Sequence, residues 1–167
     1  MTTDSGTFDV AAFYRFVDLT GVEALRNELE QRCEAGGLLG TVLLADEGVN
    51  GTLSGKAGDI RSVFDWLTGR LTLETTLDAR WSVATDAPFR RLRVRLKKEI
   101  VSLGRPDIRP QSGTGRHVTP DEWNQLLARK DTLVIDTRNR YEVEVGTFPN
   151  AVDPHTDSFR EFPDFVA

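Results

Sequence analysis

The first hundred residues alternate between two hydrophobic periods, one typical of strands and the other typical of helices. An aromatic and β-branched run at residues 13–18 predicts a half-buried strand. A helix is predicted next, because four apolar residues share one helical face and Gly36-Gly37 can end it. These four are Val22, Leu25, Leu29 and Cys33. We expect a capping box at residues 20–23, in which Thr20 and Glu23 satisfy free backbone N–H groups.

A hairpin pattern and a second helix follow. Residues 41–45 are apolar, Asn50-Gly51 is a strong turn signal, and residues 52–54 would return as the partner strand. The second helix is indicated by apolar residues at helical spacing, namely Ile60, Val63, Phe64 and Leu67. Residues 81–84 and 91–101 are typical of further strands. This order is ferredoxin-like, and it predicts an antiparallel sheet with both helices on one face.

The chain changes character after this first domain. Residues 105–116 contain two prolines and two glycines without periodicity, which predicts a linker. Residues 119–122 then combine an N-cap threonine, a proline at the first helical position and an acidic third residue, so a new helix should begin there. Residues 133–135 form a buried type of strand that ends at Asp136. We therefore expect a domain at 1–104, a linker at 105–116 and a second unit at 117–167.

Charge is distributed unevenly along the chain, although the net value is only −5. Residues 1–87 carry 7 Lys and Arg against 14 Asp and Glu, and residues 119–167 carry 5 against 10. Residues 88–118 between them carry 9 against 2. A local positive field of this kind concentrates polyanions whatever the total charge.

The basic block contains one strand with strict alternation. Three apolar residues should point inward, namely Leu92, Val94 and Leu96. The cations between them should line the other face at intervals of about 7 Å, which suits contact with successive phosphates. The candidate RNA-binding residues are Arg91, Arg93, Arg95, Lys97 and Lys98. Phe89 or Trp81 could add base stacking. The alternative interpretation is a solvated face balanced by acidic neighbours, and the pattern alone does not separate RNA from other polyanions.

Composition excludes several classes of protein and site. No apolar run approaches the roughly 18 residues that a membrane span requires, and residues 1–6 do not resemble a secretory leader. We therefore expect a cytoplasmic protein that does not contact the membrane. The single Cys33 lies on an apolar helical stripe, which favours a buried structural thiol over a reactive one. His117 and His155 have no second ligand at metal-site spacing, so we expect no metal.

Two sets of motifs carry a resemblance to known families. Residues 136–151 resemble the first half of a rhodanese domain, although Thr147 and Asn150 depart from the usual histidine and glycine. Five segments in fixed order together look like the rhodanese-related tRNA uridine hydroxylases. They are Glu47–Thr52, Pro88–Val101, Trp123-Asn124, Asp136–Asn139 and Phe159–Pro163.

The resemblance implies an α+β protein with an acylphosphatase-like, ferredoxin-like N-terminal domain, followed by the first half of an α/β rhodanese domain. It implies oxygen-dependent conversion of the wobble uridine of tRNA to 5-hydroxyuridine, with dioxygen as co-substrate and no other cofactor evident. The family's nucleophilic cysteine would lie beyond Ala167, so we expect this chain to lack a catalytic residue and to be inactive alone. Asp136 and Arg138 are expected to support the active-site region, or else to form a purely structural pair.

Two other functions stay open from the sequence. The chain could be a sulfurtransferase fragment, which would need a cysteine able to carry a persulfide, or it could be a non-catalytic RNA-binding module. The second unit has few residues and one clear strand, so we expect it to be weakly stable and to lean on the first domain or on another chain.

Overall fold

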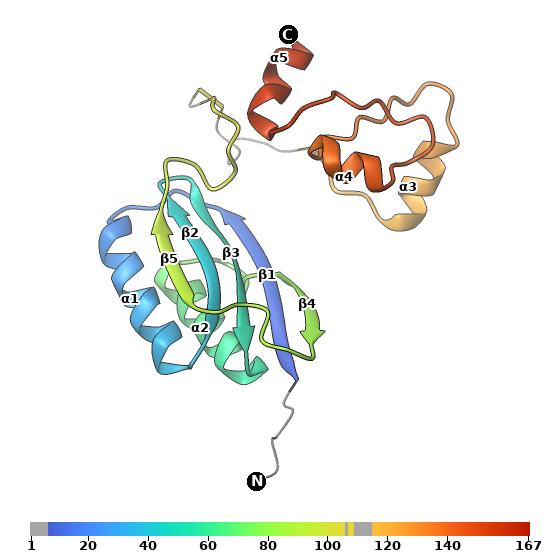
Figure 1. Ribbon diagram of the computed structural model, residues 1–167. Coiled ribbons are helices and arrows are strands. Elements are labelled where there is room, and N and C mark those ends of the chain that lie inside the picture. Colours follow the sequence, from blue (N-terminus) through green and yellow to red (C-terminus); the bar gives the residue numbers. More distant parts are fainter. Residues whose placement is uncertain (1–6, 106, 109–114) are drawn as a thin grey trace. The chain divides into compact units, whose positions relative to one another are not determined.

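The computed structural model describes residues 7–105, 107–108 and 115–167. The chain divides into two compact units, Met1–Val101 and Ser102–Ala167 (Figure 1). Most of the predicted linker at 105–116 lies outside the described residues. Each unit is treated separately below.

The first unit is a five-stranded sheet with two helices on one face (Figure 1). Its strands are β1 Phe8–Phe16, β2 Leu39–Ala45, β3 Gly48–Gly55, β4 Ala79–Ala84 and β5 Leu92–Leu96, and its helices are α1 Val22–Ala35 and α2 Ala57–Arg70. The apolar stripes predicted for both helices are buried against the sheet. The fold is therefore α+β with the expected order of elements.

The sheet is mixed, which corrects the prediction of an antiparallel sheet. The strand order is β4-β1-β3-β2-β5, and β5 runs parallel to β2. Because β4 already occupies the edge beside β1, the only remaining place for the next strand is the opposite edge, beside β2. The connection at residues 85–91 crosses the sheet and delivers β5 in the parallel direction.

The predicted capping box at residues 20–23 is wrong. The helix α1 begins at Val22 after Gly21, which adopts φ +66° and leaves Thr20 outside the helix without a capping bond. Glycine reaches this left-handed conformation without steric strain, so it can turn the chain directly into the helix. The predicted end of the helix at Gly36-Gly37 is confirmed.

The predicted hairpin is confirmed, but its turn lies earlier in the chain than Asn50-Gly51. The two residues between β2 and β3 are Asp46 and Glu47, and Asn50-Gly51 lies inside β3. Gly48 fits here because a Cβ atom would lie 2.1 Å from the carbonyl oxygen of Arg15. Asn50 has a different role from that of a turn residue, because its amide Nδ2 donates to the carbonyl oxygen of Ile100 at 2.9 Å.

The strand predicted at 91–101 is also shorter than expected. It ends at Leu96, and the following segment folds over the sheet face that the helices leave uncovered. The Ile100 N–H donates to Glu47 Oε1 at 2.6 Å, and the Ile100 side chain is buried outside the main core. This segment closes one end of the uncovered face.

The second unit contains short helices and little sheet. Its elements are α3 Pro120–Leu127, α4 Arg140–Val145, a 3-10 turn at Phe159–Glu161 and α5 Phe162–Val166. The predicted N-terminus of α3 is confirmed, with a capping box between Thr119 and Glu122. The strand predicted at 133–135 is reduced to one parallel bridge between Ile135 and Val152.

The described residues of the second unit bury no large apolar side chain. Among the residues that the structure describes, the buried hydrophobic ones lie between Ala11 and Ile100, and Thr156 is the buried residue of the second unit. Leu133, Tyr141 and Val145 are instead widely exposed. Within the described ranges of both units, no helix has the length and apolar character needed to cross a membrane.

Candidate functional site

The alternation predicted for the basic strand is present in β5. Its parallel register sets Val94 opposite Val42, and both side chains are buried toward the helices. The neighbouring Arg93 and Arg95 therefore point to the uncovered face of the sheet, which we call the outer face. Leu96 lies on the helix side but is 41% exposed, because it is the last residue of the strand.

The cations of the basic strand are available for a ligand. Arg91, Arg95, Lys97 and Lys98 are exposed, and Arg93 is half-buried. In the part of the chain that the structure describes, the ion pairs involve other cations. A positive strand without acidic partners keeps its field available for phosphates.

The free edge of β5 is held by α1. Arg26 on α1 donates from Nε to the Val94 carbonyl oxygen at 3.2 Å, and its Nη2 pairs with Glu30 at 2.9 Å. Covering an edge strand in this way blocks unwanted strand pairing. It also fixes the strand that carries the cations.

Trp81, one of the two aromatic residues expected to add stacking, lies on the wrong side of the sheet. Its ring contacts Phe64 of α2 at 6.1 Å, and the guanidinium of Arg61 lies over it at 4.9 Å. Its register partner in β1 is the buried Ala11, so Trp81 faces the helices. The stacking role predicted for Trp81 is therefore wrong, while Phe89 is half-buried in the connection before β5.

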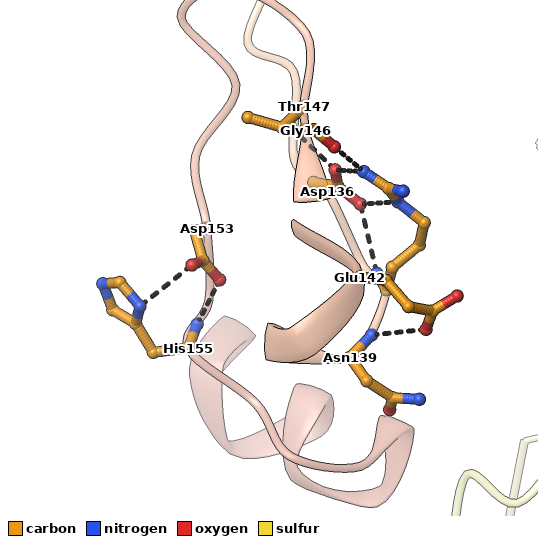
Figure 2. A network of polar contacts seen from close by, with 8 residues as sticks. Asp136, Asn139, Glu142, Gly146, Thr147, Asp153 and His155 are labelled. Atoms are coloured by element: carbon orange, nitrogen blue, oxygen red, sulfur yellow. Dashed lines mark hydrogen bonds and ion pairs between the residues drawn. The ribbon is translucent and has the colours of Figure 1, made fainter. Parts of the chain in front are cut away.

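Asp136 and Arg138 form a compact polar cluster in the second unit. Figure 2 shows Asp136 beside Gly146 and Thr147. The guanidinium donates from Nε to Asp136 Oδ1 at 2.9 Å and from Nη2 to Oδ2 at 2.6 Å. Nη2 also donates to the Gly146 carbonyl oxygen at 2.7 Å. The pair predicted from the sequence is thus brought together, and it clamps the loop that follows α4.

Thr147 completes this cluster. Its hydroxyl donates to Asp136 Oδ2 at 2.7 Å, and the carboxylate is 9% exposed. The hydrogen bonds from Arg138, followed by the one from Thr147, hold the pKa of Asp136 well below its usual range. A carboxylate engaged in this way is a poor proton acceptor, so the arrangement suits a positioning role. The sequence had signalled Thr147 only as a departure from the rhodanese pattern.

The cluster borders a hollow of about 600 Å³. Apolar residues make up much of its lining, including Val134, Ile135 and the edge-to-face pair of Trp123 and Phe148, whose ring centroids are 5.1 Å apart. A mostly apolar cavity with a few convergent polar groups is the usual form of a small-molecule or base-binding site.

The remaining candidate groups do not join this site. Cys33 is completely buried on α1, and burial, followed by Glu30 and Glu34, raises its pKa to about 12. It is a structural thiol, as predicted. His117 is exposed, and His155 lies at the surface beside Asp153, with Nδ1 at 3.0 Å from Oδ2 (Figure 2).

Comparisons with known proteins agree on one family. Residues 8–100 match the family described as UPF0176 acylphosphatase like domain. The proteins named tRNA uridine(34) hydroxylase from Agrobacterium fabrum, Mesorhizobium japonicum and Rhizobium leguminosarum bv. trifolii are 48%, 50% and 46% identical to this chain. The alignments cover 97%, 94% and 98% of this chain, but only 51%, 50% and 53% of those relatives.

The chain therefore spans about half the length of the curated relatives it matches. Among solved structures, an acylphosphatase from Coxiella burnetii is matched with 18% identity and a TM-score of 0.41, over 57% of this chain and 100% of that chain. The assignment of the first unit depends on the family match and not on this likeness.

Proposed function

This chain belongs to the UPF0176 acylphosphatase-like family, and on that premise we propose that it is the N-terminal portion of a tRNA uridine(34) hydroxylase. The observation that carries the proposal is the 46–50% identity to proteins of that name across both units of the chain. The reaction is the oxygen-dependent formation of 5-hydroxyuridine at the wobble position, with dioxygen as co-substrate and no further cofactor. The substrate is tRNA, and the protein works in the cytoplasm.

The chain contributes binding and positioning groups, not the nucleophile. Its only cysteine, Cys33, is buried and has its pKa raised to about 12, so it cannot act as a thiolate near neutral pH. The isolated chain is therefore inactive as a hydroxylase. This also disfavours a sulfurtransferase, which would need an accessible thiol, and no relative named above carries that activity in its name.

The basic strand contacts the phosphates of tRNA. Arg93 and Arg95 project from the outer face, Arg91, Lys97 and Lys98 flank them as exposed residues, and all five lie in the segment that matches the family. The proposed contact residues are Arg91, Arg93, Arg95, Lys97 and Lys98. Charge complementarity of this kind supplies much of the affinity for nucleic acid and makes it depend on salt.

In the second unit, Asp136 and Arg138 position the loop at Gly146-Thr147 beside the hollow. The clamp has three charge-assisted hydrogen bonds, which are stronger than neutral ones. The same unit exposes Leu133, Tyr141 and Val145, and these residues form a self-association surface when nothing else covers them.

A chimera tests the proposed function directly. This chain should replace the matched half of the Agrobacterium fabrum relative, and tRNA from cells that depend on the chimera should be digested and analysed by mass spectrometry. We expect 5-hydroxyuridine at position 34. A folded, expressed chimera that forms none, beside an active parent protein, would contradict the proposal.

A further inference from the structure

The outer face of the sheet presents its residues in rows that run across the strands. One row is formed by Tyr14, Asn50, Leu43 and Arg95, each opposite the next on neighbouring strands. The adjacent row is formed by Arg80, Ala12, Thr52, Thr41 and Arg93. Both rows end in a cation on β5, and the second row also begins with one on β4.

Tyr14 is an aromatic side chain held outward on this face. It is 53% exposed, and its ring meets that of Phe16 edge-on with centroids 6.0 Å apart. Ala11 and Phe13, which precede it on the opposite face of β1, belong to the buried core. The backbone at Tyr14 is paired with Asn50 of β3, the central strand of the sheet, which supports the ring.

The cations lie at a fixed distance from this ring. Tyr14 and Arg95 occupy the same row three strand spacings apart, which is about 14 Å. Asn50 and Leu43 lie between them in this row, and in the adjacent row the short side chains of Thr41 and Thr52 form a cross-strand pair. The outer-face positions of the five described strands include no aspartate or glutamate.

One end of the face is closed. The Ile100 segment reaches this end of the face, where Asn50 and Glu47 hold it by hydrogen bonds at 2.9 and 2.6 Å. Because Asn50 belongs to the row that contains Tyr14, the Ile100 segment lies directly beside this row. A ligand that lies along this row is bounded on one side by the Ile100 segment.

We infer that the outer face binds a single-stranded RNA segment, with a base stacked on Tyr14 and the phosphates on the cations of β5. The inference rests on the proposed function, for which the anticodon loop of tRNA supplies the single strand. Sheets bind single strands by stacking bases on exposed aromatic rings, while cations follow the backbone. A duplex offers no unstacked base to Tyr14, and an apolar protein partner would leave the arginines unpaired.

The test measures binding of a fluorescein-labelled oligouridylate to the full chain by fluorescence anisotropy, with an RNA duplex of equal length as a second probe. We expect the oligouridylate to bind more tightly than the duplex. Tyr14→Ala should weaken oligouridylate binding roughly 5- to 150-fold, the range found for loss of one stacked base. Tyr14→Phe should restore it, because the ring stacks and the hydroxyl is not required.

Tyr141 supplies a matched control. It is the other tyrosine of the chain, it is 66% exposed, and it lies in the second unit. Tyr141→Ala should leave binding unchanged. If Tyr14→Ala proves unstable in thermal denaturation, Tyr14→Leu keeps apolar bulk without an aromatic ring and should still lose affinity.

Oligouridylate binding that is unchanged in folded Tyr14→Ala or Tyr14→Leu overturns the inference, as does equal binding of single strand and duplex. The outcome is separable from the proposed function. If the chimera makes 5-hydroxyuridine but Tyr14 is dispensable for oligouridylate binding, only the inference about the outer face is refuted. An inactive chimera with binding that depends on Tyr14 refutes only the hydroxylase assignment.

Discussion

Iodoacetamide should alkylate Cys33 in the folded chain far more slowly than it alkylates an ordinary thiol. The side chain is completely buried, and burial raises its pKa to about 12. At about pH 8, a thiol with a pKa of about 8.5 is roughly one quarter ionised, whereas a pKa of about 12 leaves about one molecule in ten thousand ionised. Ionisation alone therefore slows alkylation by about three orders of magnitude.

The same shift makes the stability of the first unit depend on pH. The folded state keeps the Cys33 thiol protonated, whereas the unfolded chain loses this proton above about pH 8.5. The stabilisation is thus fully present below that value and is lost as the pH rises toward 12. By about pH 10 the loss amounts to about 2 kcal/mol.

Urea denaturation at about pH 8 and pH 10, for the wild-type chain and for Cys33→Ala, isolates this contribution from other titrating groups. Intact-mass spectrometry after iodoacetamide treatment should show alkylation of Cys33 only under conditions in which the chain unfolds. Rapid labelling of the folded chain at about pH 8, or an equal loss of stability in Cys33→Ala, would refute the buried, protonated thiol.

Three further predictions concern the two units. Because the pKa of Asp136 is lowered in the folded state, its contribution to the stability of the second unit should be present above about pH 4 and lost as the pH falls. NMR spectra of the wild-type chain should show this acid transition, and those of Asp136→Asn should not. Gly48→Ala should strongly destabilise the first unit in thermal denaturation because its Cβ would meet backbone, whereas Gly58→Ala, with open space around it, should not. Amide hydrogen exchange should be faster throughout residues 119–167 than in residues 13–100, because the described residues of the second unit bury no large apolar side chain. Equal protection of the two ranges would contradict that reasoning.

The helices and the hairpin of the first unit were predictable because burial imposes a period on the sequence. The spacing of apolar residues predicts α2 without any knowledge of the rest of the fold, because one face of the helix must be buried in the core. These residues are Ile60, Val63, Phe64 and Leu67. The alternation in β5 likewise predicted which side chains face outward. These patterns are local, so one sequence is enough to recognise them.

Features that depend on distant backbone were not predictable. Gly48 is required because β3 approaches Arg15 of β1, and Asn50 is retained in a strand because it bonds to Ile100. The parallel pairing of β5 follows from which sheet edge is already occupied. A local turn signal such as Asn50-Gly51 carries no information about any of these contacts.

In the candidate site too, local features were predictable and contacts between distant segments were not. Asp136 and Arg138 are two residues apart, and their pairing could be expected, but Thr147 joins them only through the loop after α4. The sequence does not separate Trp81 from the RNA face, because the two faces of a strand near the edge of a sheet are difficult to distinguish from sequence. Tyr14 could have been found, since it alternates with the apolar residues Ala11 and Phe13.

The salt dependence of RNA binding reports directly on the proposed phosphate contacts of the basic strand. The measurement compares wild-type chain with the triple variant Arg91→Ala, Arg93→Ala, Arg95→Ala, using an anticodon stem-loop RNA with uridine at position 34. A control variant removes three arginines from the helix side instead, namely Arg32, Arg61 and Arg70. Each lost phosphate contact should reduce the slope of log K against log salt by about 0.7, so the triple variant should lose about 2.

Between about 50 and 200 mM KCl, this difference means that the affinity of the wild-type chain should fall about 20-fold more than that of the triple variant. The control variant should keep the slope of the wild type. An unchanged slope and affinity in the triple variant would show that the basic strand does not hold RNA.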